Sequence, residues 1–268
     1  MNQQFTFRKS FGQNFLKDTS IVRKIVATVP LTKEDLVIEV GPGSGMLTKE
    51  IAPHVKQMLC YEIDTRLEEI LATNLQEFSN IDIVFEDFMT RDISADLAKY
   101  EYKKLYFIAN LPYYITTPII TKLIESHLPF ESITVMVQKE VGDRFSAKPG
   151  SKDYGSLTVF LNYYFDVKKE FVVSRNCFVP KPNVDSVIVT LKKKETKFQV
   201  NNEEHFFKLV KDSFQYKRKS IRNNLKSYDL EKIESVLKTY GYDLKVRAES
   251  LQPEIFASIS NELTKDNT

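Results

Sequence analysis

Short apolar runs alternate with amphipathic segments through the first half of the chain. The runs are five or six residues long, as expected for strands buried in a parallel sheet, and they span residues 36–40, 57–61, 81–85, 105–109 and 132–137. The intervening segments have helical spacing and cover residues 19–29, 46–52, 65–78 and 118–125. This alternation predicts an α/β fold: a Rossmann-like, mainly parallel sheet with helices on both faces.

The pattern changes in the second half of the chain. Two further runs, Leu157–Phe165 and Glu170–Val173, look like strands, and Val184–Leu191 alternates as a last strand. Beyond Lys194 the apolar positions have helical spacing, in the segments 203–214, 216–225, 229–239 and 253–263. We therefore expect a catalytic domain over residues 1–194 and a small all-helical domain over residues 195–268.

A glycine-rich turn follows the first strand directly. It reads Gly41-Pro42-Gly43-Ser44-Gly45, and the next strand ends in Glu62, 21 positions after Gly41. A strand, a glycine turn, a helix and an acid at this distance open a nucleotide-binding unit, in which the acid accepts hydrogen bonds from ribose hydroxyls. The sequence therefore predicts a nucleoside-bearing cofactor. The glycine spacing is one residue tighter than the dinucleotide pattern, which argues against an NAD-dependent dehydrogenase.

The fourth strand ends in the loop Asn110-Leu111-Pro112-Tyr113. Loops at the carboxyl ends of strands bind ligands in open α/β sheets. The Asn110 side-chain oxygen and the Leu111 carbonyl are two acceptors that a turn stiffened by Pro112 could aim at an exocyclic amine, leaving the nitrogen lone pair free to attack. Tyr113 could then stack on the base. A helix-capping Asn and a core Tyr are the alternative interpretation.

Two further residues could complete such a site. Asp87, which follows the third strand, could accept a hydrogen bond from an adenine amino group, or could cap the next helix. Phe178 stands beside Pro180 and Pro182 on what looks like an exposed loop. It could form the second face of an aromatic clamp opposite Tyr113, or it could simply pack the loop.

Basic residues gather toward the C-terminus. The net charge of the chain is +2, but residues 186–250 hold 15 Lys and Arg against 9 Asp and Glu. Four of these cations fall within six positions, at Lys217, Arg218, Lys219 and Arg222. The cluster predicts contact with RNA phosphates, and a solvated helix face is the alternative.

The N-terminal segment carries a second basic pair, Arg8 and Lys9. These two side chains could meet RNA phosphate, while Asn14 and Leu16 could cover the cofactor pocket. A disordered leader is the simpler interpretation of this segment.

Composition excludes several classes of protein. The two cysteines, Cys60 and Cys177, and the three histidines stand in no metal-ligand pattern. No apolar run is long enough to span a bilayer, and the first residues contain no signal-peptide core. We expect a soluble, cytoplasmic and monomeric protein that needs no metal.

Taken together, these features resemble the ribosomal RNA adenine N6,N6-dimethyltransferases, which use S-adenosylmethionine (SAM). The resemblance covers nearly the whole chain. It rests on the motifs Gln13–Leu16, Glu39–Gly45, Glu62–Asp64, Glu86-Asp87, Asn110–Tyr114, Val137–Glu140, Asp153–Leu157, Phe178–Pro182 and Arg218–Asn224. One departure is Arg218-Lys219-Ser220, where the family pattern is more uniformly basic.

The resemblance implies roles for particular residues. Gly41 would lie by the methionine end of SAM, Glu62 on its ribose and Asp87 on its adenine amine. The full set of expected cofactor contacts is Asn14, Leu16, Gly41, Gly43, Glu62, Asp87 and Asn110. The candidate catalytic residues are Asn110, Leu111, Pro112, Tyr113 and Phe178.

Within the family, the chain looks most like the enzymes that modify two adjacent adenosines in the 3′-terminal hairpin of small-subunit (16S) rRNA. The expected partner is therefore rRNA within a pre-assembled small ribosomal subunit. One alternative is a large-subunit (23S) methyltransferase that confers macrolide resistance, although those relatives usually carry Ile or Val where Leu111 stands. A non-catalytic rRNA-binding assembly factor is another, against which the intact Asn110–Tyr113 loop argues.

Overall fold

The protein divides into two compact units, each of which is described by itself. The structure is a computed structural model that describes residues 14–195 and 198–265. The first unit holds the described residues up to Gly142 together with Lys168–Lys193, and the second holds Asp143–Val167 together with the described residues from Lys194 onward. This division differs from a boundary after residue 194 in giving residues 143–167 to the second unit. The boundary after residue 194 stays a prediction.

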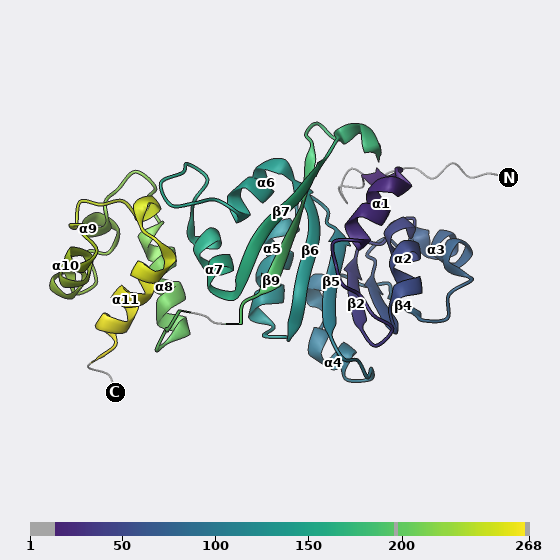
Figure 1. Cartoon of the computed structure of the whole chain (residues 1–268), viewed down its shortest axis with the longest axis horizontal. Coiled ribbons are helices and arrows are strands. Elements are labelled where there is room, and N and C mark those ends of the chain that lie inside the picture. Colours follow the sequence, from purple (N-terminus) through teal and green to yellow (C-terminus); the bar gives the residue numbers. More distant parts are fainter. Residues whose placement is uncertain (1–13, 196–197, 266–268) are drawn as a thin grey trace. The chain divides into compact units, whose positions relative to one another are not determined.

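A seven-stranded sheet forms the centre of the first unit (Figure 1). In order across the sheet, its strands are β4 (Ile81–Val84), β3 (Gln57–Tyr61), β2 (Leu36–Val40), β5 (Leu105–Asn110), β6 (Phe130–Gln138), β9 (Ser186–Lys193) and β7 (Phe165–Val173). The strands from β4 to β6 pair in parallel, and β9 pairs antiparallel with β6. The predicted α/β class with a mainly parallel sheet is confirmed.

Helices flank this sheet (Figure 1). They are α1 (Thr19–Val26), α2 (Met46–Ile51), α3 (Glu68–Leu75), α4 (Ile93–Leu97), α5 (Thr116–Glu125) and α6 (Lys139–Phe145), with short 3₁₀ turns at Ala52–His54, Thr65–Leu67, Phe88–Thr90 and Arg175–Cys177. Side chains alternate between the two faces of a strand. Met58 and Cys60 of β3 therefore pack with the apolar residues of α1 and α2, whereas Tyr61 contacts Phe88 on the opposite face.

A small second sheet ties the start of the described chain to a distant segment. β1 (Phe15–Leu16) pairs antiparallel with β8 (Phe178–Val179), so that Leu16 lies opposite Phe178. The expectation that Phe178 sits on an exposed loop is wrong, because its side chain is 2% exposed and packs in the core with Leu16 and Val173. Pairing with β1 is what buries it, and that long-range contact has no local signal in the sequence.

The second unit is helical. Its helices are α7 (Ser156–Tyr164), α8 (Glu203–Ser213), α9 (Ile221–Asn224), α10 (Leu230–Thr239) and α11 (Pro253–Leu263), with a 3₁₀ turn at Ala248–Ser250. Rings from α7 and α8 form its aromatic core: Phe160 lies 4.9 Å from Phe207, and Tyr163 lies 5.4 Å from Phe206, between ring centroids. The predicted strand Leu157–Phe165 is therefore wrong, since this run forms α7. An apolar run with both sides buried fits a strand or a helix equally well.

The predicted helix Tyr216–Leu225 is wrong in its first half, because only Ile221–Asn224 is helical. The buried Asn224 side chain explains the difference. It accepts a hydrogen bond from the backbone N–H of Tyr216 and donates to the carbonyls of Ser213 and Tyr216. These bonds satisfy the backbone of a turn that would otherwise need helical partners. Lys217, Arg218 and Lys219 thus stand on a turn before α9, with Arg222 on α9 itself.

The described residues hold neither a helix able to cross a membrane nor a cluster of metal-binding side chains. None of the described helices combines the length and apolar character needed to cross a bilayer. Among the same residues, no group of three or more His, Cys, Asp or Glu side chains is arranged to hold a metal ion.

Candidate active site

The glycine turn connects β2 to α2 and has backbone angles that favour glycine. Gly41, Gly43 and Gly45 all have positive φ angles, of 71°, 60° and 80°. Gly43 also meets the Phe15 ring so closely that a Cβ atom placed on it would lie 2.8 Å from a ring carbon. The turn therefore needs glycine at residue 43 for two reasons, its backbone conformation and the space left by Phe15.

Glu62 links this turn to the end of β3. Its carboxylate accepts hydrogen bonds from the backbone N–H groups of Gly43, at 3.1 Å, and of Asp64, at 2.9 Å. The side chain is 5% exposed, and burial raises its pKa above the usual value, although hydrogen bonds from the backbone of Asp64, Gly43 and Ile63 act in the opposite direction. A carboxylate offers about four acceptor positions, so Glu62 keeps acceptor capacity beyond these two bonds.

A second buried carboxyl lies behind the turn. Glu39 of β2 is 1% exposed and accepts a hydrogen bond from the Thr48 hydroxyl at 2.7 Å. Burial raises the pKa of Glu39 to about 8, and the negative charge of Glu62 contributes to the rise. Glu39 is therefore protonated near neutral pH, unlike an ordinary surface carboxyl.

The loop after β5 holds Asn110 in a defined orientation. The Asn110 amide nitrogen donates to the backbone carbonyl of Asn14 at 3.3 Å. Because the two ends of a primary amide point apart, this bond turns the amide oxygen of Asn110 away from Asn14 and leaves it as an acceptor. The Leu111 N–H donates to Met136 O at 3.3 Å, and the Ile115 N–H closes a turn onto Pro112 O at 3.2 Å. The loop is thus fixed at several backbone positions.

Tyr113 is fixed through its hydroxyl. The phenol oxygen lies 2.7 Å from the Ser186 hydroxyl at the start of β9, and burial raises the pKa of Tyr113. The neighbouring Tyr114 is 57% exposed. The two consecutive tyrosines therefore have different surroundings, and Tyr113 is the one held in place.

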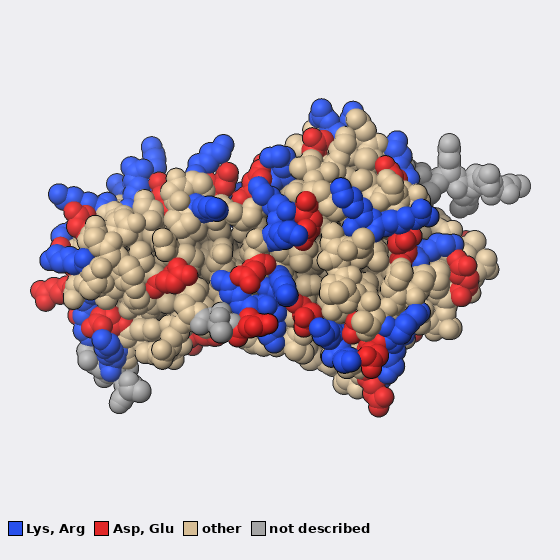
Figure 2. Space-filling model, viewed as in Figure 1, with Lys and Arg blue, Asp and Glu red and all other residues tan. Residues whose placement is uncertain are grey.

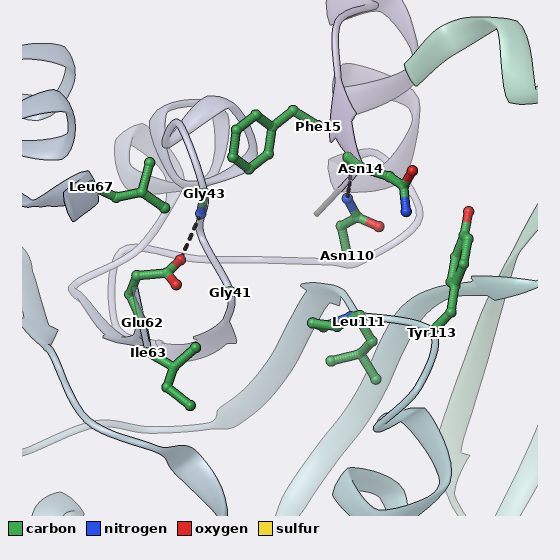
Figure 3. A pocket seen from close by; sticks show the side chains of 11 residues that line it. Asn14, Phe15, Gly41, Gly43, Glu62, Ile63, Leu67, Asn110, Leu111 and Tyr113 are labelled. Carbon is green, nitrogen blue, oxygen red and sulfur yellow. Dashed lines mark hydrogen bonds between the residues drawn. The ribbon is translucent and has the colours of Figure 1, made fainter. Parts of the chain in front are cut away.

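One pocket brings most of the predicted site residues together (Figure 3). The glycine turn and Glu62 lie on one side of it, and Asn110, Leu111 and Tyr113 lie on the other (Figure 3). Its lining residues are Asn14, Phe15, Gly41, Gly43, Glu62, Ile63, Leu67, Asn110, Leu111, Pro112 and Tyr113.

The remaining predicted residues lie elsewhere. Leu16 lines an adjoining pocket with Gly41, Gly43 and Asn110. Asp87 caps the 3₁₀ turn Phe88–Thr90 by accepting from the Met89 N–H at 2.9 Å. Phe178 is buried in the core, on the strand that pairs with β1, and is not among the residues lining either pocket. Arg8 and Lys9 lie outside the described residues.

Sequence reasoning did not select three of the lining residues, Phe15, Ile63 and Leu67. Phe15 stands between the two selected residues Asn14 and Leu16, and Ile63 directly follows Glu62. Their proximity to selected residues is a usable signal. Leu67 shows only the helical period of a core residue, so nothing in the sequence distinguishes it.

The basic cluster lies on the second unit. Lys217, Arg218, Lys219 and Arg222 are all exposed, and the Lys217 ammonium donates to the backbone carbonyl of Lys152 at 2.8 Å. Figure 2 shows Lys and Arg side chains along the upper edge of this unit, where Figure 1 draws the α6–α7 and α8–α9 connections.

Comparison with known families shows which family the chain belongs to. The sequence profile described as "Ribosomal RNA adenine dimethylase" matches residues 4–265. The chain belongs to this family. The family that the motifs resemble is thereby confirmed, and with it a methyl-transferring enzyme.

Close relatives of this adenine dimethylase match along nearly their whole length. A "Ribosomal RNA small subunit methyltransferase A" from Streptococcus gordonii is 45% identical over 271 residues, which cover 98% of this chain and 93% of the relative. A protein of the same name from Oceanobacillus iheyensis is 43% identical over 265 residues, covering 96% and 90%.

Two solved structures share the fold of this adenine dimethylase. A dimethyladenosine transferase from Plasmodium falciparum superposes with a TM-score of 0.81 at 26% identity, covering 94% of this chain and 98% of that one. A 23S rRNA methyltransferase superposes with a TM-score of 0.73 at 28% identity, covering 94% and 100%.

Proposed function

We propose that this enzyme transfers methyl groups from SAM to N6 of two adjacent adenosines in the 3′-terminal hairpin of small-subunit rRNA. The observation that carries the proposal is the position of Asn110: its amide is fixed by Asn14 in the same pocket as the glycine turn and Glu62. Relatives named as small-subunit methyltransferases, 43–45% identical over nearly their whole length, support the choice of rRNA.

The pocket residues fit SAM. A Cβ atom on Gly43 would collide with Phe15, so glycine keeps this side of the pocket open. Glu62 keeps acceptor positions for ribose hydroxyls in addition to its bonds with Gly43 and Asp64. Asn14 and Leu16 lie at the same pair of pockets, which supports their expected roles as a cover. Asp87 would accept from the adenine amine through the carboxylate lone pairs that its capping bond leaves. SAM supplies a methyl group on an electrophilic sulfonium.

Asn110 and Leu111 prepare the nucleophile. An adenine amino group is a weak nucleophile because its lone pair is delocalised into the ring. The Asn110 amide oxygen and the Leu111 carbonyl would each accept one N–H of the amine, which favours a tetrahedral nitrogen with a free lone pair. Pro112 stiffens the turn that aims these acceptors. The protein thus contributes position and electrostatics, and no acid–base group is needed to activate the nitrogen.

The target adenine has to leave its stack to reach this loop. Tyr113 offers an aromatic face at the pocket and would stack on the extruded base. Phe178 is the second candidate for the clamp. Its ring is 2% exposed, so that role requires β8 to shift when RNA binds.

Exposed cations would bind the RNA phosphates. Lys217, Arg218, Lys219 and Arg222 are placed to meet phosphate on the second unit, and Arg8 and Lys9 are further candidates outside the described residues. The partner we propose is the rRNA of a pre-assembled small ribosomal subunit, met in the cytoplasm by a monomer of this enzyme.

A methylation assay on both ribosomal subunits tests the proposal. Undermethylated small subunits and, separately, large subunits are incubated with the enzyme and tritiated-methyl SAM, and the labelled nucleotides are mapped. We expect N6,N6-dimethyladenosine at two adjacent positions in the 3′-terminal hairpin of the small-subunit rRNA. Asn110→Ala should lower the rate at least about 100-fold while SAM binding changes by only a few-fold.

The same assay separates the other candidates. Label confined to large-subunit rRNA would favour a 23S methyltransferase. This alternative is motivated by the structural similarity to a 23S rRNA methyltransferase at 28% identity. Binding to small subunits with no transfer would favour an assembly factor without turnover. Wild-type rates from Asn110→Ala would remove Asn110 from the role of holding the amine.

A further inference from the structure

The Tyr113 ring has a partner that the proposed reaction does not account for. Its hydroxyl lies 2.7 Å from the Ser186 hydroxyl, the usual distance of an O–H···O hydrogen bond. Ser186 is fully buried, although serine is usually an exposed residue. A stacking platform needs only the face of its ring, so this hydroxyl contact calls for a separate explanation.

Ser186 is itself held rigidly. It is the first residue of β9 and lies opposite Gln138 in the antiparallel pairing of β9 with β6. Just outside this ladder, the backbone N–H of Lys139 donates to Asp185 O at 3.0 Å, so the pairing extends past the strand end. The hydroxyl that meets Tyr113 therefore projects from a fixed part of the central sheet.

The residues before Ser186 hold the turn that leads to Phe178. The Asp185 carboxylate accepts from the backbone N–H of Arg175 at 3.0 Å, and the Arg175 guanidinium donates to Asn183 O at 2.8 Å. Phe178 follows this turn directly. The segment Asn183–Ser186 thus contacts both the Tyr113 ring and the turn that leads to β8.

We infer that Ser186 is a positioning residue: its hydroxyl sets the orientation of the Tyr113 ring on which the target adenine stacks. The inference rests on the proposed function. Tyr113 sits on a partly exposed loop, where its ring could otherwise occupy several rotamers. A hydrogen bond from the sheet to the hydroxyl end of the ring selects one of these rotamers. A base that stacks in the wrong orientation is methylated more slowly even when it still binds.

A double-mutant cycle tests the inference. Ser186→Ala and Tyr113→Phe each remove one partner of the bond, and Phe keeps the ring available for stacking. Because a neutral hydrogen bond contributes roughly 0.5–1.5 kcal/mol, each variant should lower kcat for methyl transfer about 3- to 10-fold. The double variant should be no slower than the slower single variant. SAM affinity, measured by calorimetry, should not change.

A matched control lies on the same two strands. Thr190 of β9 pairs its hydroxyl with that of Thr134 on β6 at 3.2 Å, away from the pocket. Thr190→Val removes this hydroxyl contact at nearly constant volume and should leave kcat unchanged. A fall in kcat with Thr190→Val as large as that with Ser186→Ala would show that the rate reports loosening of the sheet, and it would overturn the inference.

Two other outcomes would also overturn the inference. The first is wild-type kcat for either Ser186→Ala or Tyr113→Phe, and Tyr113→Phe decides the matter alone if Ser186→Ala does not fold. The second is a double variant whose loss is the product of the two single losses, since independent residues behave in that way. Failure of the proposed function is distinguishable, because the wild-type enzyme would then transfer no methyl group to small subunits.

Discussion

Glu62 is the residue that holds the glycine turn against the end of β3. Its buried carboxylate accepts two backbone N–H groups, from Gly43 in the glycine turn and from Asp64 after β3. Removing it would leave both N–H groups without their acceptor and would loosen the turn. A single acid thus orders the pocket, and we propose that its remaining acceptor positions bind a ribose.

We predict that Glu62→Ala weakens SAM binding by about 10- to 100-fold, because the loss of one hydrogen bond to a charged group costs about 1.5–3 kcal/mol. Isothermal calorimetry measures the effect. The control is Glu77→Ala, which removes an exposed acid paired with Lys49 at the surface and should keep the wild-type affinity. Unchanged affinity for Glu62→Ala would remove Glu62 from the ribose.

The burial of Glu39 makes the free energy of unfolding depend on pH. In the folded protein Glu39 keeps its proton up to about pH 8, whereas in the unfolded chain it ionises near its ordinary pKa of 4.5. Between these two values the folded state binds the extra proton. The contribution of Glu39 to stability is therefore complete below the unfolded pKa and is lost as the pH rises through the folded pKa.

We predict that Glu39→Gln removes this pH dependence. The amide oxygen of Gln can still accept the Thr48 hydroxyl, and Gln does not ionise. Between about pH 5 and about pH 9, the wild-type free energy of unfolding should fall relative to that of Glu39→Gln by roughly 2–5 kcal/mol. Urea unfolding at the two pH values measures the difference. Parallel pH profiles for the two proteins would mean that Glu39 is ionised in the folded state.

The glycine turn and β1 act together as elements. Phe15 of β1 packs onto Gly43 and also against the Leu67, Leu71 and Leu75 side chains. The pairing of β1 with β8 holds the Phe15 ring against the glycine turn. Because Asn14 directly precedes β1 and anchors Asn110, both sides of the pocket are supported by the same segment.

We predict that Gly43→Ala lowers SAM affinity by about 10-fold or more, since its Cβ would displace Phe15 and strain a φ angle of 60°. Calorimetry and thermal unfolding separate the two effects. Gly241→Ala is the matched control, because Gly241 has a φ angle of 78° with nothing within 4 Å of an added Cβ. It should lose stability by a similar backbone cost yet bind SAM normally. Equal SAM affinity in the two variants would argue against the role of Phe15.

The sequence predicted elements whose signal is local. The runs in β2, β3 and β5 are mainly apolar and flanked by turn residues, and the structure has them as parallel strands. α7 was mistaken for a strand because its aromatic and β-branched residues are buried against α8, which an apolar run does not reveal. The burial of Phe178 and the turn held by Asn224 likewise depend on partners far along the chain.

The residues of the candidate site also divide into those with a local signal in the sequence and those without one. Gly41, Gly43, Glu62 and Asn110 stand at or just after the ends of parallel strands. The rule that ligands bind at the carboxyl ends of such strands therefore locates them together in advance. Ser186 could not be found by that rule. It begins an antiparallel strand, and only the pairing of β9 with β6 brings its hydroxyl to Tyr113.

Charge is distributed unevenly along the chain. The protein as a whole carries a net charge of only +2, while the cations that we assign to RNA cluster on one turn and one short helix of the second unit. A net charge this small gives little long-range attraction to RNA. The grip on rRNA should therefore depend on a few local phosphate contacts, and its salt dependence should report their number.

We predict that the triple variant Lys217→Gln, Arg218→Gln, Lys219→Gln binds undermethylated small subunits more weakly and with a shallower salt dependence. Each lost phosphate contact reduces the slope of log affinity against log salt by about 0.7–0.9, so the slope should fall by about 2 to 3. Lys217 already donates to the Lys152 carbonyl, which favours the lower end of this range. Filter binding across a series of salt concentrations gives the slope, and kcat at saturating substrate should stay near the wild-type value.

The control for charge is a triple variant at a different edge of the protein, Lys99→Gln, Lys103→Gln, Lys104→Gln. These lysines are exposed and precede β5, at the opposite end of that strand from Asn110. The control loses the same formal charge, so any effect of net charge appears equally in both variants. If the two salt slopes fall by the same amount, the turn before α9 has no specific contact with rRNA. If only the first slope falls, three cations on that turn account for the difference, because net charge and the chemistry at Asn110 are unchanged between the two variants.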